Sequence, residues 1–203
     1  MKNLLLDKVE DFTKLSQSMG EWRIYLEFIE AYFRNRKIKK PMIVEIGTGW
    51  GRQKWFYEEF LGYSHIGIDK DCRFGNPDIL GYSRNPSTLN KLKEKLAGRE
   101  VNLLYIDAEH TYSAVKGDYE IYSPLAKNII VIHDIVIKEL QDTVGKFWNE
   151  LIAENIEAQD RTFITLTGYC SPFKHRGRGR KHPKDILGQG TGLILLGESW
   201  PYL

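Results

Sequence analysis

The chain has few cysteines and no long apolar run. Its 203 residues include only two cysteines, Cys72 and Cys170, which lie far apart and form no Cys-x-x-Cys pair. This usage indicates a reduced, cytoplasmic protein. No run of 18 or more apolar residues occurs, so we expect no membrane span. The apolar stretch within residues 1–7 is too short for a signal peptide.

Neither sign of charge dominates the chain. The sequence has 29 basic and 27 acidic residues, for a formal net charge of +2. Six of the basic residues crowd into the acid-free segment 174–184, the basic loop, and without them 23 basic residues face 27 acidic ones. A mildly acidic body with one basic segment is a poor general surface for nucleic acid, which is therefore not the expected partner. The basic loop fits either a solvated loop or a clamp for an anionic substrate.

The length suits one domain with one core, preceded by a helical segment. In residues 1–40 apolar side chains recur at spacings of three and four, at Trp22, Leu26, Ile29 and Phe33. This stripe predicts an amphipathic helix packed on the core. Pro41 cannot continue that helix, so we expect the main domain to cover residues 41–203.

Short apolar runs alternate with helical patterns in the main domain. Strands are expected at residues 42–46, 65–68, 79–80, 101–106, 129–132, 163–166 and 193–196. Helices are expected at residues 53–61, 89–96, 111–125 and 140–151. Ser87 is the expected N-cap of the second of these helices. The alternation predicts an α/β fold with a Rossmann-like, doubly wound and mostly parallel sheet covered by helices on both faces.

A glycine-rich turn follows the first expected strand. Gly47, Gly49 and Gly51 lie at alternate positions, and Asp69 ends the next strand about twenty residues later. Such glycines let the backbone approach an adenosine-containing cofactor, while the acid takes a pair of ribose hydroxyls. Position 52, where the dinucleotide fingerprint has its third glycine, is Arg52, which argues against a nicotinamide-dependent oxidoreductase.

Polar side chains gather at the ends of the expected strands. They are Glu45, Asp69, Asp107, His110, His133 and Asp134. In an open α/β sheet the ligand sits beyond the carboxyl ends of the strands. The shared location of these residues therefore predicts one site at that edge.

The turn pattern Glu-x-Gly-x-Gly-x-Gly, from Glu45 to Gly51, resembles the first motif of class I S-adenosylmethionine-dependent methyltransferases. The resemblance implies S-adenosylmethionine as the cofactor. It assigns to the cofactor Glu45, Gly47, Thr48, Gly49, Asp69, Ser83 and Asp107. Glu45 would organise the loop, Asp69 would bind the ribose, and Ser83 would line the adenine.

A second pattern, Asp-x-x-His-x-Tyr-x-x-Val-x-x-Asp, runs from Asp107 to Asp118 and is followed by Pro-Leu and by His133-Asp134. It resembles a subgroup that includes the cephalosporin-hydroxylase-like proteins and metal-dependent sugar and macrolide O-methyltransferases. The resemblance covers residues 42–196. It implies a seven-stranded sheet whose last strand is antiparallel.

Two aspartates are the expected metal ligands. Asp107 and Asp134 should end adjacent parallel strands, which lie about 4.8 Å apart, so their carboxylates could share one divalent cation, with magnesium expected. His133 either ligates a softer metal or hydrogen-bonds a backbone group. His110, three residues after Asp107, is in the place of a catalytic base in the related sugar methyltransferases, and Asp107 would act with it.

The sequence thus predicts a methyltransferase that uses S-adenosylmethionine, with metal-assisted O-methylation of a sugar or a glycosylated small molecule. The acceptor could be anionic because of the basic loop, and a homo-oligomer is compatible with the sequence. Two alternatives stay open. One is a non-catalytic binding module on the same fold, and the other is an RNA methyltransferase guided by the basic loop.

Overall fold

The computed structural model describes residues 19–136, 140–155, 157, 160–167 and 190–197. Residues 1–18 of the expected helical segment, the whole basic loop and Cys170 lie outside the described residues. Among the described residues, no helix is both long enough and apolar enough to cross a membrane.

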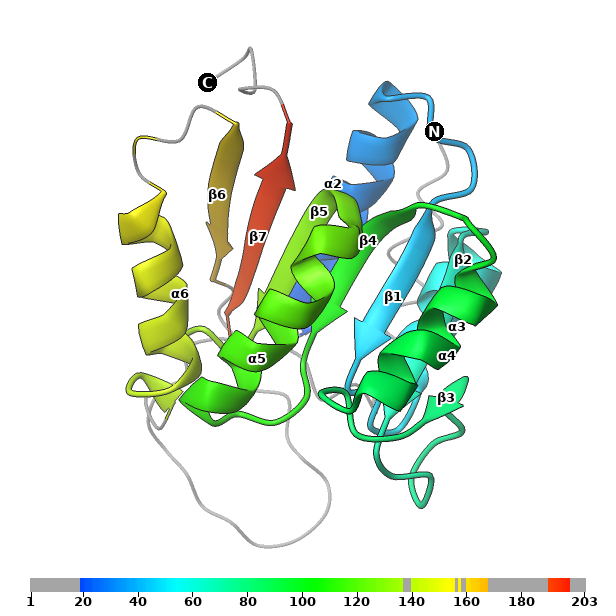
Figure 1. Ribbon diagram of the computed structural model, residues 1–203. Coiled ribbons are helices and arrows are strands. Elements are labelled where there is room, and N and C mark those ends of the chain that lie inside the picture. The colour runs from blue at the N-terminus through cyan, green and yellow to red at the C-terminus, as the bar shows by residue number, and fades with distance from the viewer. Residues whose placement is uncertain (1–18, 137–139, 156, 158–159, 168–189, 198–203) are drawn as a thin grey trace, which may run out of the picture.

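A seven-stranded mixed sheet runs through the molecule (Figure 1). Its order is β3-β2-β1-β4-β5-β7-β6. In chain order the strands are β1 (Met42–Ile46), β2 (Ser64–Asp69), β3 (Ile79–Leu80), β4 (Val101–Ile106), β5 (Ala126–His133), β6 (Arg161–Leu166) and β7 (Thr191–Leu196). The five strands β1 to β5 pair in parallel, and β7 is antiparallel to both of its neighbours. The predicted doubly wound sheet, with its antiparallel last strand, is confirmed.

Helices cover both faces of this sheet. They are α2 (Met19–Asn35), α3 (Arg52–Trp55) with its continuation η1 (Phe56–Phe60), α4 (Pro86–Leu96), α5 (Tyr112–Tyr122) with the short turn η2 (Ser123–Leu125), and α6 (Val144–Glu154). Figure 1 shows α4, α5 and α6 in front of the sheet and α2 and α3 behind it. Strands therefore alternate with helices, and each face of the sheet is buried.

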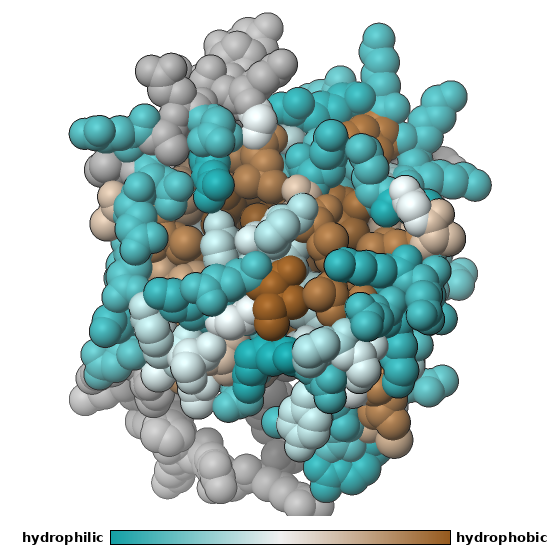
Figure 2. Space-filling view, in the orientation of Figure 1, coloured by the Kyte–Doolittle hydropathy of each residue, from teal (hydrophilic) through white to brown (hydrophobic). Residues whose placement is uncertain are grey.

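Two apolar clusters fill the space between the sheet and its helices. The front cluster joins α4, α5 and α6 to side chains such as Val44 and Ile132, and the rear cluster joins α2 to Leu103 and Val131. The predicted stripe of α2 lies in the rear cluster, where all four of its residues are at most 2% exposed. Figure 2 shows the outer faces of the front helices as mostly hydrophilic, with apolar groups between them.

The start of α4 differs from the prediction. The N-cap is Asn85, whose Oδ1 accepts a 3.0 Å hydrogen bond from the backbone N–H of Ser87. Ser87 therefore lies within the first turn, and its prediction as the cap is wrong. Pro86 takes the first helical position, where a missing N–H has no cost and the fixed φ suits a helix.

Candidate functional site

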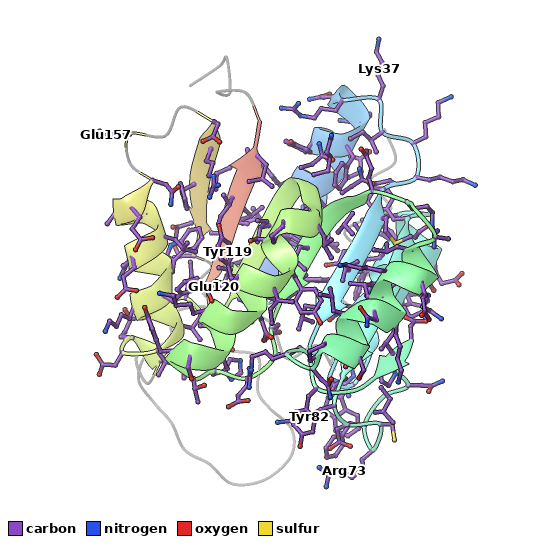
Figure 3. All side chains as sticks on the ribbon, in the orientation of Figure 1. Lys37, Arg73, Tyr82, Tyr119, Glu120 and Glu157 are labelled. Carbon is purple, nitrogen blue, oxygen red and sulfur yellow. The ribbon has the colours of Figure 1, made fainter. Side chains whose placement is uncertain are left out.

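The site lies at the carboxyl edge of the parallel strands. β1 pairs with β2 on one side and with β4 on the other, and β4 pairs with β5, so the loops that follow these strands meet at one edge. A cavity of about 280 Å³ opens there. Figure 3 shows Tyr82 and Arg73 at this edge, beyond the strand ends. The cavity is lined by Ile46, Gly47, Thr48, Gly49, Trp50, Arg52, Gln53, Ile68, Asp69, Lys70, Gly81, Tyr82, Ser83, Arg84, Asp107, Ala108 and Glu109.

The glycine turn packs directly on the end of β4. Gly47 has φ of +89°, in the left-handed region, and a Cβ added to it would lie 2.1 Å from the carbonyl oxygen of Asp107. Its N–H donates to the carbonyl of Ile68 at 2.8 Å, and the N–H of Asp107 donates to that of Ile46 at 2.9 Å. A side chain at position 47 would force this turn away from the strand end.

Asp69 connects the turn to the end of β2. Its Oδ2 accepts a 2.8 Å hydrogen bond from the N–H of Gly49, and its Oδ1 accepts one of 2.9 Å from the N–H of Asp71. These bonds fix the carboxylate at the cavity wall. Each carboxylate oxygen has a second lone pair, so Asp69 retains acceptor capacity for a hydroxyl pair in the cavity.

Glu45 lies below the turn instead of in the cavity wall. It is fully buried, and its Oε2 is 2.8 Å from Nε2 of His65 on β2. Burial raises the pKa of Glu45, and the His65 imidazole opposes that shift. Thr48, by contrast, lines the cavity although it is only 8% exposed. The side chain of Glu45 contacts His65, so its role in organising the turn stays a prediction.

Ser83 lies in the cavity wall between β3 and α4. Its Oγ donates a 2.6 Å hydrogen bond to Oδ1 of Asp118 on α5, and its carbonyl accepts one of 2.6 Å from the hydroxyl of Tyr122. The next residue, Arg84, pairs with Glu109 at 2.9 Å. The sequence placed Ser83 near the adenine but gave no role to Asp118 or Tyr122, because only the packing of α5 brings them beneath this segment.

A cluster of carboxylates and imidazoles adjoins the cavity. Asp107, His110 and Asp134 each offer one ligand atom, and these atoms lie within 4.8 Å of one another. Nε2 of His110 is 3.0 Å from Oδ2 of Asp134 and 3.4 Å from Oδ1 of Asp107. The convergent group therefore includes His110, which the sequence suggested as a base.

His133 lies on the buried side of the same cluster. Its side chain is 2% exposed, and its ring stacks on Tyr105 with centroids 6.1 Å apart. Nδ1 is 3.0 Å from Oδ1 of Asp134 and 3.5 Å from Oδ2 of Asp107. His133 does not belong to the convergent group of three, so its ligand role stays a prediction.

The two imidazoles and two carboxylates shift one another's pKa values. Hydrogen bonds to Asp107 and Asp134 raise the pKa of His110 to about 10. Burial lowers the pKa of His133, but the same carboxylates outweigh burial and raise it to about 10. Burial raises the pKa of both carboxyl groups, and the imidazoles more than reverse this, so both pKa values lie below their usual range.

Asp134 has a strained backbone. Its φ is +63°, a left-handed conformation that costs a non-glycine residue on the order of 1–2 kcal/mol. Such strain collects at functional sites, where the surrounding structure holds it. Here it places the Asp134 carboxylate opposite His110, one residue beyond the end of β5.

Several lining residues carried no prediction from the sequence. Trp50 and Tyr82 are 57% and 65% exposed at the cavity rim, with the guanidinium of Arg52 5.1 Å from the Trp50 ring and the ammonium of Lys70 5.8 Å from the Tyr82 ring. The only feature of the sequence that could have indicated these residues is their position, because each lies in or just after the glycine turn or just after a predicted strand. The sequence assigned no role in the site to Arg52, which only occupies the position of the third glycine in the dinucleotide fingerprint.

Comparison with other sequences does not identify a family for this chain. No family model matches the chain. The chain is 26% identical over 102 residues to the uncharacterized protein y4gI of Sinorhizobium fredii (strain NBRC 101917 / NGR234). The matched stretch covers 49% of this chain and 11% of that protein.

Comparison with solved structures is more informative. Cofactor-bound Rv0187 from MTB is 15% identical with a TM-score of 0.56, covering 98% of this chain and 92% of that one. An O-methyltransferase from Bacillus cereus in complex with SAH is 14% identical with a TM-score of 0.51, covering 97% and 92%.

The MycE methyltransferase of the mycinamycin biosynthetic pathway, in complex with Mg, SAH and mycinamycin VI, is 13% identical with a TM-score of 0.53 and covers 87% of this chain. This chain spans half of MycE. Together these likenesses show that the chain has the Rossmann-like fold of class I S-adenosylmethionine-dependent methyltransferases.

Proposed function

We propose that this protein transfers a methyl group from S-adenosylmethionine to a hydroxyl oxygen, with a divalent cation positioning that oxygen. One observation carries the proposal: Asp107 belongs both to the wall of the cofactor cavity and to the convergent group with His110 and Asp134. Donor and acceptor would therefore meet at one carboxylate. Holding two reactants in register supplies much of the acceleration of a displacement reaction.

The cavity fits the donor. Gly47 lets the glycine turn pack against the end of β4, Asp69 retains lone pairs for the ribose, and Ser83, which the motif resemblance assigns to the adenine, lies in the cavity wall. All three flank the same space of about 280 Å³. Cofactor binding is the part of the proposal that this geometry supports best.

The convergent group fits a cation. Two carboxylates and one imidazole supply ligand atoms within 4.8 Å of one another. Magnesium is the metal that the sequence suggested. The imidazole of His110 also suits first-row transition metals. When bound, a cation would lower the pKa of a coordinated hydroxyl group.

His110 has to lose a proton before it can act as a base. With a pKa of about 10 it is an imidazolium at neutral pH, held by Asp107 and Asp134. Positive charge placed between the carboxylates would compete with that proton, as metal binding commonly does. We propose that Asp107 and Asp134 orient the acceptor. His110, once neutral, either completes the cation's ligand set or removes the acceptor's proton, because the single lone pair of Nε2 cannot do both.

We propose a sugar or a glycosylated small molecule as the acceptor. The cations Arg52 and Lys70 at the cavity wall are consistent with an anionic one. The role of the basic loop in such an acceptor site stays a proposal, since the loop lies outside the described residues. An RNA acceptor and a homo-oligomer also stay proposals, because no contact among the described residues supports either of them.

Calorimetry with S-adenosylhomocysteine is the first experiment. We expect micromolar binding by the wild-type protein and methyl transfer to a panel of sugars in the presence of Mg²⁺ or Mn²⁺. Absence of binding at high micromolar concentration would overturn the cofactor assignment. Binding without turnover on any acceptor would favour the non-catalytic module, and turnover insensitive to EDTA would remove the cation from the proposal.

A further inference from the structure

Asp118 is a buried acid that takes no part in the proposed reaction. Its side chain is fully buried on α5, directly beneath the cavity-wall segment. Oδ1 accepts the hydrogen bond from Ser83, whereas Oδ2 has no hydrogen-bond partner and lies 4.0 Å from the Arg84 guanidinium. An acid buried in this way costs free energy, so its contact with Ser83 calls for an explanation.

The hydrogen bond to Asp118 fixes the direction of the Ser83 hydroxyl. A serine hydroxyl has one hydrogen to donate and two lone pairs. Ser83 donates its hydrogen to Asp118. Burial raises the pKa of Asp118, while the Ser83 hydrogen bond and the Arg84 guanidinium oppose that shift, and the ionised carboxylate can only accept. Any further hydrogen bond of the Ser83 hydroxyl, including one to a ligand in the cavity, is therefore one that it accepts. The Tyr122 hydroxyl, bonded to the Ser83 carbonyl, holds the same residue from the backbone side.

The chemistry of the ligand follows from this polarity. On a neutral adenine joined to ribose, the exocyclic amino group is the only N–H donor of the ring. A base with a carbonyl oxygen at the same position would point lone pairs at lone pairs. We propose that Asp118 is a positioning residue that makes Ser83 an acceptor and thereby selects a 6-amino over a 6-oxo purine, an inference that rests on the proposed cofactor site.

Two ligands and three variants test the proposal. S-adenosylhomocysteine and S-inosylhomocysteine differ at position 6 of the purine and in the proton that the 6-oxo ring carries on N1, and calorimetry gives the ratio of their affinities. The wild-type protein should prefer the amino ligand by roughly ten- to hundredfold, the range for leaving a buried polar group unpaired. In Asp118→Asn the amide can donate to Ser83, so the hydroxyl can turn toward the cavity and the ratio should fall toward one.

Tyr122→Phe is the matched control. It removes the anchor of the Ser83 carbonyl but keeps the carboxylate, so both affinities should fall together and the ratio should stay at the wild-type value. Ser83→Ala removes the acceptor itself and should lower the ratio as Asp118→Asn does. Ser83 is partly exposed, so this variant tests the idea even if the Asp118 variant unfolds on a thermal scan.

The outcomes separate this inference from the proposed function. A wild-type protein that binds S-adenosylhomocysteine without preference over the inosyl ligand overturns the selection by Ser83. A preference for the amino ligand that persists in both Asp118→Asn and Ser83→Ala also overturns the selection by Ser83. In both cases the cofactor assignment stands. A wild-type protein that binds neither ligand overturns the proposed function, and the inference with it.

Discussion

The N–H of Gly49 donates a 2.8 Å hydrogen bond to Oδ2 of Asp69, which joins the glycine turn after β1 to the end of β2. The two residues are twenty apart in sequence and form one wall of the cavity. A change at Asp69 therefore alters both the turn and the proposed ribose contact.

Asp69→Ala should weaken binding of S-adenosylhomocysteine by at least about tenfold, because it removes a charge-assisted acceptor and frees the Gly49 amide. Calorimetry measures the change. Asp71→Ala is the control, since the Asp71 side chain pairs with Arg73 at an exposed site. Equal losses in the two variants would count against a ribose contact.

Gly47→Ala should destabilise the fold. The new Cβ would lie 2.1 Å from the Asp107 carbonyl in a left-handed backbone, so we expect a loss of roughly 2–4 kcal/mol in the free energy of unfolding. Gly62→Ala is the control, because Gly62 has φ of +70° but open space around its Cβ position, and it should cost about 1 kcal/mol. Urea denaturation measures both, and equal costs would contradict the close approach.

Removing one carboxylate should abolish cation binding. Asp134→Asn should lose Mn²⁺ binding followed by electron paramagnetic resonance, whereas Glu109→Gln should retain it because Glu109 pairs with Arg84 outside the convergent group. The imidazole ligand should favour Co²⁺ over Mg²⁺ by at least about tenfold in the wild-type protein. Retained Mn²⁺ binding in Asp134→Asn would remove this site from consideration.

The stability of the protein in EDTA should fall at alkaline pH. The pKa values of His110 and His133 rise from 6.5 to about 10 on folding, so the folded state binds more protons than the unfolded state between these limits. The stabilisation is complete below pH 6.5 and is lost as pH rises through 10. The midpoint of thermal unfolding should drop by roughly 5 °C from pH 7 to 10.

His133→Gln should flatten this dependence, because it removes the more deeply buried of the two imidazoles. Scanning calorimetry of both proteins across the pH range supplies the comparison. A wild-type midpoint that rises with pH over this interval would show that the imidazoles are neutral in the folded state.

Much of the frame could be read from the sequence. The strand at residues 42–46 has the bounds of β1, and the strand at 101–106 has those of β4, because each is a continuous apolar run between clear breaks. The predicted start of α4 was wrong because Ser87 was taken as the N-cap in place of Asn85. Both residue types are good N-caps, and only the backbone conformation distinguishes them.

The sequence by itself determined the order of strands and helices and the acids at the strand ends, because hydrophobic period and turn residues act over short stretches. Only the tertiary structure decided which further side chains come into contact with these acids. It grouped His110 with Asp134, which lies 24 positions further along, and placed Asp118 beneath Ser83. Those contacts depend on the packing of α5 against the sheet and on the left-handed turn at Asp134, and local sequence specifies neither.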